Sequence, residues 1–74
     1  MEVNAPWPGT VQEIAVSAGD RVERDQPLLT LEAMKMLTPI LAPEAGTVGA
    51  VQVAVGDFVE ERAVLLTLEA GGPV

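Results

Sequence analysis

The segment Leu28–Ala33 reads LLTLEA, and Leu65–Ala70 repeats it letter for letter 37 residues later. With the same offset, Ala5–Ala33 aligns without a gap to Ala42–Ala70, and 16 of the 29 aligned positions are identical. A unit of this length is too short to bury a core of its own. We therefore expect the two units to form one domain by packing on one another about a pseudo-two-fold axis.

Each unit predicts strands rather than helices. Val, Ile, Leu and Thr occur in short runs separated by Pro and Gly, and no stretch keeps apolar residues at helical spacing for long enough to form a helix. The most apolar strands are predicted at Pro27–Glu32 and Val64–Glu69. Four leucines of these strands are expected in the core: Leu29, Leu31, Leu66 and Leu68. The predicted fold class is all-β.

Two irregularities recur in both units. The alternation of apolar and polar residues slips within Val11–Ile14 and again within Val48–Val51, which predicts a bulge in each unit. Ser17–Asp20 and Ala54–Asp57 predict tight turns, in which Gly adopts positive φ and Asp accepts a hydrogen bond from a nearby backbone amide. Short strands are expected directly after these turns, at Arg21–Glu23 and Phe58–Glu60.

The composition excludes several classes of function. The 74 residues contain no Cys and no His, so we expect no thiolate nucleophile, imidazole base or ordinary zinc site. The formal net charge of −7 argues against nucleic acid as a partner. The apolar runs are too short for membrane insertion, and Met1–Asn4 does not resemble a signal peptide. We expect a cytoplasmic domain without catalytic residues.

The segment Ala33–Leu37 (AMKML), between the two units, departs from the local rules. The chain must reverse here between two strands, yet none of these residues is Gly, Asn, Asp or Pro. Such departures are typical of functional sites. Lys35 lies at the centre of the reversal and is the only lysine of the chain, so a modification directed at amines has one side-chain target.

The residues around Lys35 resemble a known attachment motif. Glu32–Met36 (EAMKM) is similar to the motif of biotinyl domains, the carboxyl carrier modules of biotin-dependent carboxylases, decarboxylases and transcarboxylases. Ala5–Gly9 (APWPG) resembles the Ala-Pro-Met-Pro-Gly opening of that family, and Val16–Val22 with its copy Val53–Val59 resembles its paired turns. The resemblance extends from about Val3 to Leu68.

The resemblance implies a flattened barrel-sandwich hybrid of two four-stranded antiparallel sheets with the pseudo-two-fold repeat. Residues 1–74 would form a single biotinyl domain, with the hairpin 33–37 carrying the attachment lysine and residues 71–74 forming a flexible tail. Some members carry an inserted thumb in the first half. Since Val11–Leu28 is as long as Val48–Leu65, we expect a thumbless domain.

The resemblance also implies a function. Biotin, joined through an amide to Lys35 by biotin protein ligase, would accept an activated carboxyl group at a biotin carboxylase and release it at a carboxyltransferase. The domain itself would act as a non-catalytic carrier with a swinging arm, because the cofactor supplies the chemistry. Lysine amines are protonated at neutral pH, so the ligase would have to supply the base.

Five further residues are candidates for recognition of partners: Glu32, Ala33, Met34, Met36 and Trp7. Strand geometry places Met34 and Met36 on the face opposite Lys35, where they either fill the core or contact partners. Trp7 stands where the family usually has Met. If the pseudo-two-fold axis holds, Trp7 reaches the lysine end, where it either caps the open end of the core or lies against the prosthetic group.

Other interpretations of the same residues remain open. A lipoyl domain shares the fold, the repeat and the lysine hairpin, although lipoyl domains usually have Asp before the lysine and a small residue after it. An unmodified β-module that only docks other proteins would leave Lys35 as an ordinary solvated charge. A copper site formed by Met34 and Met36 is disfavoured because no His or Cys is present to complete it.

Overall fold

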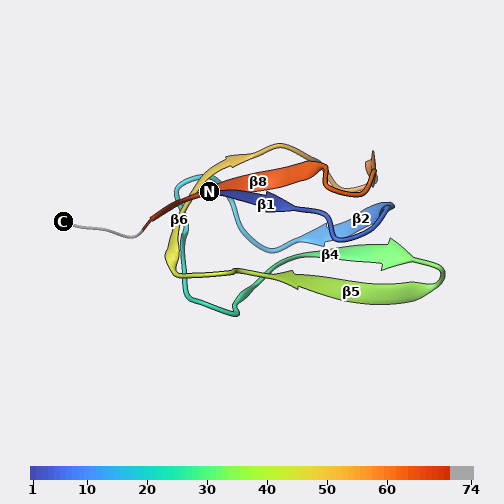
Figure 1. Ribbon diagram of the computed structural model, residues 1–74, viewed down its shortest axis with the longest axis horizontal. Helices are drawn as coiled ribbons and strands as arrows, with labels where there is room; N and C mark the ends of the chain where they lie inside the picture. The colour runs from blue at the N-terminus through green and yellow to red at the C-terminus, as the bar shows by residue number, and fades with distance from the viewer. Residues whose placement is uncertain (71–74) are drawn as a thin grey trace.

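The computed structural model describes residues 1–70 and places them in eight strands that form two four-stranded antiparallel sheets (Figure 1). The strands are β1 (Glu2–Asn4), β2 (Gly9–Ile14), β3 (Arg21–Val22), β4 (Pro27–Ala33), β5 (Met36–Leu41), β6 (Gly46–Val51), β7 (Phe58–Val59) and β8 (Val64–Ala70). One sheet has the order β1-β8-β6-β3 and the other the order β5-β4-β2-β7. The expected all-β class is confirmed.

The strand boundaries differ little from the predicted ones. The short strands β3 and β7 each end one residue early, and the apolar strands β4 and β8 each continue one residue further. Residues 1–70 contain no helix of the length and apolarity that a membrane span requires. The expectation of a flexible tail concerns residues 71–74, which lie outside the described part of the chain.

The two units are related as the repeat predicts. The offset of 37 residues maps β2 onto β6, β3 onto β7 and β4 onto β8, and it maps β1 onto the second half of β5. Each sheet therefore takes its outer short strand from the other unit, because β3 pairs with β6 and β7 pairs with β2. The units are interlocked, and neither could form its sheet alone.

Backbone hydrogen bonds between the units also repeat. The amide of Gly56 donates to the carbonyl oxygen of Val11 at 2.8 Å, and the amide of Val11 donates to the carbonyl oxygen of Asp57 at 2.8 Å. The equivalent bonds with the units exchanged join Gly19, Val48 and Asp20. The turn of one unit thus closes against a strand of the other, which fixes the pseudo-two-fold arrangement.

The predicted turns and bulges are present. In Ser17–Asp20 and Ala54–Asp57 the Asp carboxylate accepts a hydrogen bond of 2.9 Å from the amide of the first residue. The Gly of each turn has a φ of 94° or 97°, which an L-residue adopts only with strain. The register of β2 against β4 shifts between Val11 and Glu13, and the register of β6 against β8 shifts at the matching place.

The core lies between the sheets and is apolar throughout. Among the described residues no polar or charged side chain is buried. The four leucines expected in the core are at most 2% exposed. Burial of a leucine side chain stabilises the folded state by about 1.5–3 kcal/mol, so the two central strands β4 and β8 contribute the largest share.

Candidate functional site

The Lys35 hairpin joins β4 to β5 through two residues. Ala33 pairs with Met36, so Met34 and Lys35 alone form the loop. Their φ angles are 52° and 65°, and positive φ at both central positions is the property of the type I′ turn that suits the twist of antiparallel strands. Asn and Gly usually occupy these positions. Here the pairing that runs from Pro27 to Ala33 imposes the turn on side chains that do not favour it.

The hairpin projects beyond the rest of the molecule. β5 has six residues, whereas its symmetry counterpart β1 has three, so the β4–β5 ribbon continues past the end of the facing sheet (Figure 1). Lys35 is exposed, and Met34 and Met36 are 93% and 67% exposed. The interpretation of the two methionines as core residues is therefore wrong, because no strand within residues 1–70 covers them.

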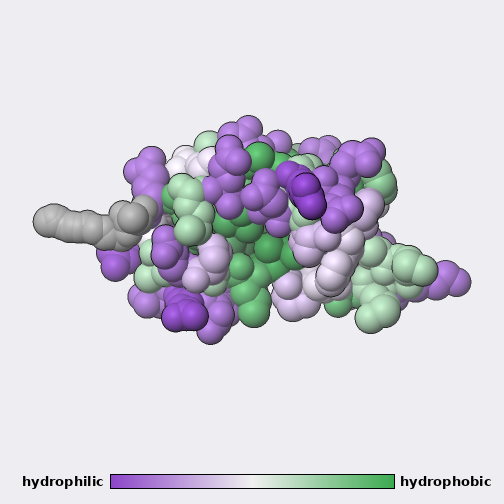
Figure 2. Space-filling model, viewed as in Figure 1, coloured by the Kyte–Doolittle hydropathy of each residue, from purple (hydrophilic) through white to green (hydrophobic). Residues whose placement is uncertain are grey.

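The two faces of the hairpin differ in chemistry. Met34 and Met36 line a pocket on one face, whereas Lys35 lines a depression on the other, as strand geometry predicts. Figure 2 shows weakly hydrophobic side chains gathered at the hairpin end of the molecule beside a hydrophilic tip. The lysine amine is thus presented between an apolar surface and a polar one.

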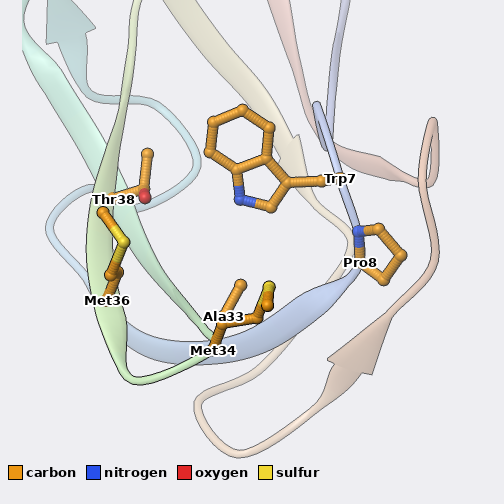
Figure 3. A pocket seen from close by; sticks show the side chains of 6 residues that line it. All are labelled: Trp7, Pro8, Ala33, Met34, Met36 and Thr38. Carbon is orange, nitrogen blue, oxygen red and sulfur yellow. The ribbon is translucent and has the colours of Figure 1, made fainter.

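The apolar surface is a pocket of about 480 Å³, which we call the Trp7 pocket (Figure 3). Its six lining residues are Trp7, Pro8, Ala33, Met34, Met36 and Thr38. Since Thr38 pairs with the buried Leu31 across the ladder, both lie on the face of the sheet that forms the core. The pocket therefore lies between the two faces that enclose the core, beyond the last buried core residues.

Trp7 forms the wall opposite the hairpin. The amino group of Met1 donates to the carbonyl oxygen of Leu68 at 2.8 Å, and β1 runs from there along β8 toward the hairpin end. The indole reaches toward Met36 and Thr38 in Figure 3, and 43% of Trp7 remains exposed. The expected delivery of Trp7 to the lysine end is confirmed. Whether Trp7 caps the open end of the core or contacts the prosthetic group stays a prediction.

Gly9 allows this wall to approach the hairpin. A Cβ atom at Gly9 would lie 2.9 Å from the carbonyl oxygen of Glu32 and 3.6 Å from the Cβ of Ala33. Such a short distance between a Cβ atom and a backbone oxygen would push β2 and β4 apart. Gly therefore lets β2 lie against the end of β4, and Pro8 and Trp7 follow it to the base of the hairpin.

The polar depression surrounds Glu32. Gln12 donates a hydrogen bond from Nε2 to the Glu32 carboxylate, which is half-buried. Besides these two residues, the depression is lined by Glu13, Thr30, Lys35 and Leu37. Glu32 is thus held in place in the depression that Lys35 also lines, and its role in recognition stays a prediction.

Sequence reasoning missed Gln12 and Thr38. The signal that could have found Gln12 is divergence within the repeat, because position 12 holds Gln where the second unit has Gly49, while Glu32 and Glu69 are identical. Residues 1–70 hold no cluster of three or more His, Cys, Asp or Glu that could ligate a metal ion. The chemistry available at the hairpin is that of a primary amine, which can be acylated to a stable amide.

The chain resembles known proteins over nearly its whole length. Residues 1–68 match the family model described as "Biotin-requiring enzyme". The biotin carboxyl carrier protein of Streptococcus mutans is 53% identical over 38 residues, which are 51% of this chain and 29% of that protein. The chain spans less than a third of the length of the curated relatives it matches.

Solved structures share the fold. A single-chain, multi-domain long-chain acyl-CoA carboxylase superposes with a TM-score of 0.84 at 35% identity, over 89% of this chain and 7% of that one. The lipoyl domain of the 2-oxoglutarate dehydrogenase complex from Azotobacter vinelandii superposes with a TM-score of 0.84 at 27% identity, over 97% of this chain and 99% of that one. Both similarities agree with a sandwich of two four-stranded sheets.

Proposed function

The chain belongs to the family of biotin-requiring enzymes, and we propose that it is a biotin carboxyl carrier domain in which biotin is joined through an amide to Lys35. The observation that carries this proposal is the geometry of the hairpin. The only lysine of the chain lies at the tip of a two-residue turn, exposed and flanked by two exposed methionines. A ligase can reach such an amine from nearly every side.

The residues of the hairpin present the amine and do not activate it. The chain has no His or Cys that could take the proton of the lysine, and the proposal assigns the base to the modifying enzyme. When bound, biotin supplies a ureido nitrogen that carries the carboxyl group. The protein contributes position and reach, because a tethered group meets each successive site at a high effective concentration without a tight interface.

The proposed partners are biotin protein ligase, a biotin carboxylase and a carboxyltransferase. The relatives named as a biotin carboxyl carrier protein and an acyl-CoA carboxylase support this assignment. The short stretch of those proteins that the chain matches supports a carrier module rather than a catalytic subunit. We propose that Glu32, Ala33, Met34 and Met36 contact these partners, since they surround the amine on both faces of the hairpin.

The lipoyl alternative has less support. The lipoyl domain shares the fold across nearly all of both chains, so the architecture does not discriminate between the two groups. The discriminating feature is local. The exposed Met34 and Met36 match the pattern of biotinyl domains, whereas lipoyl domains usually carry Asp and a small residue at these positions.

Intact mass spectrometry after co-expression with each ligase tests the proposal. With biotin protein ligase we expect a mass gain of one biotinyl group on the wild-type chain, and with a lipoyl ligase we expect none. Lys35→Arg is the matched control, because it keeps an exposed cation while removing the acylated amine. Biotin on the Arg variant would contradict the assignment of Lys35. A gain from the lipoyl ligase alone would indicate a lipoyl domain, and a gain from neither would indicate an unmodified docking module.

A further inference from the structure

We propose that the Trp7 pocket is a resting site for the biotinyl group of the same chain, in which the apolar atoms of the group pack against the indole of Trp7. This inference rests on the proposed attachment of biotin to Lys35. It adds a defined contact to a carrier whose prosthetic group would otherwise move freely in solvent. It also assigns a role to Trp7, which stands where the resemblance leads one to expect Met.

The first argument is proximity. The residues on either side of Lys35, Met34 and Met36, both line the pocket, so a group on the lysine amine begins at its rim. Lys35 itself is exposed at the tip. Its flexible chain of methylenes can therefore turn over the edge of the hairpin, from its own polar face to the apolar one, without displacing any packed side chain.

The second argument is the chemistry of the lining. The side chains are apolar except for the hydroxyl of Thr38 and the indole N–H of Trp7 (Figure 3). The alkyl arm and the sulfur of biotin match such a surface, since thioethers and aromatic rings attract one another. The ureido group does not match it, because burying polar atoms without hydrogen-bond partners is costly. We therefore infer that the ureido group stays toward solvent.

The third argument is the asymmetry of the repeat. The second unit has Glu44 and Ala45 where the first has Trp7 and Pro8, and Glu44 is exposed. An aromatic side chain, Trp7, occupies this position only in the first unit, whose strand β4 leads to Lys35. An indole that merely sealed the core would be equally useful at the equivalent position of the second unit, where the chain has a carboxylate.

The openness of the pocket limits the strength of the contact. Trp7 keeps 43% of its surface exposed and Met34 keeps 93%, so a group in the pocket is covered on one side only. Such a contact is weak enough to release the arm for the sites that it must visit. The pocket is therefore a resting place that lowers the exposure of the prosthetic group between visits.

Fluorescence and NMR of the biotinylated chain test the inference directly. Trp7 is the only Trp, so its emission has no background from other residues. After biotinylation is verified by intact mass, we expect the acrylamide quenching constant of Trp7 to fall by roughly half, because a flat ring shielded on one face leaves only the other to the quencher. Nuclear Overhauser effects should join indole protons to the methylene protons of the biotinyl arm.

Two variants with similar exposure serve as a matched pair. Met36→Ala removes one wall of the pocket and should reduce the change in quenching, whereas Leu37→Ala alters the opposite face and should leave it intact. Equal effects of the two variants would overturn the inference. Trp7→Met should abolish the Overhauser contacts to position 7 and shorten the rotational correlation time of the arm.

The outcomes separate this inference from the proposed function. A chain that gains biotin but shows unchanged quenching and no Overhauser contacts with the indole overturns the resting site and leaves the carrier function standing. Contacts from the arm to Gln12 or Thr30 would place the group on the polar face and also overturn it. A chain that gains no biotin contradicts the proposed function itself, and the resting site falls with it.

Discussion

The two repeat units have the same interior and different surfaces. Leu28–Leu31 and Leu65–Leu68 are identical in sequence, and the three leucines of each segment are buried to the same extent. Most positions that differ lie at the surface, among them Trp7, which corresponds to Glu44, and Gln12, which corresponds to Gly49. Identity within the repeat therefore includes the buried residues that build the fold, and divergence at Trp7 and Gln12 distinguishes the lysine end, where Glu32 and Ala33 are the same as in the second unit.

The two ends of the molecule also differ, because β5 is longer than its counterpart β1. β5 continues for three residues beyond the part that matches β1, and this extension carries the hairpin away from the core. Met36 and Thr38 on this extension form the pocket with Trp7, and Leu37 on its other face contributes to the polar depression. A longer strand on one side of a symmetric pair is enough to create a projecting site.

The largest expected effect tests the shared interior. Leu29→Ala and Leu66→Ala should each destabilise the domain by about 2–5 kcal/mol, because each removes a fully buried side chain and leaves a cavity. The two losses should be similar, since the positions are equivalent. Urea denaturation of both variants measures this. A domain of this size has little stability to lose, so unchanged midpoints for both would refute the pseudo-symmetric core.

A smaller effect compares two close contacts of glycine, one in each unit, at positions that are not equivalent in the repeat. Gly9→Ala should destabilise by about 1–3 kcal/mol, because its Cβ would lie 2.9 Å from a backbone carbonyl oxygen of β4 that cannot move alone. Gly49→Ala should cost less, because the nearest atom, at 2.7 Å, is the side-chain hydroxyl of Thr67, which can rotate away with the loss of only its hydrogen bond from the Ala50 amide. Thermal denaturation compares the two. An equal loss would mean that the backbone contact at Gly9 is no more restrictive than the side-chain contact at Gly49.

The fold was predictable because the same pattern of strands and turns occurs in both repeat units. Bulges, turns and core leucines each recur at the same offset. A pattern that is too weak to interpret in a single unit is reliable when it occurs in both. The pseudo-two-fold axis then placed Trp7 near Lys35, a contact between residues that no local rule connects. Only strand ends were off, by one residue, because fraying of a pairing ladder leaves no sequence signal.

The site was less predictable where it departs from the repeat. The apolar character of Met34 and Met36 is compatible with both burial and exposure. Only the length of β5 relative to the facing strand shows that no part of residues 1–70 covers them. The hydrogen bond from Gln12 to Glu32 depends on the bulge in β2, which turns the side chain of the extra residue. Both features follow from how strands end and bend, which periodicity does not encode.

The smallest expected effect concerns the turn that separates the two surfaces. Met34→Gly should stabilise the domain by about 0.5–1 kcal/mol, because Gly adopts the φ of 52° without the steric cost that Met incurs, and this gain exceeds the extra entropy of the unfolded chain. Met36→Gly is the matched control. It lies two residues later at an ordinary strand position with paired backbone, where Gly should destabilise by a similar amount.

Opposite signs for these two exposed methionines, measured by urea denaturation, would establish that the Lys35 turn is held by the strand ladder against local preference. Loss of stability in both would show that Met34 contributes more by packing in the Trp7 pocket than it costs by its backbone conformation. Biotinylation rates of the same two variants add a second reading. If the ligase recognises the methionine side chains, both variants are labelled more slowly, even though one is more stable than the parent.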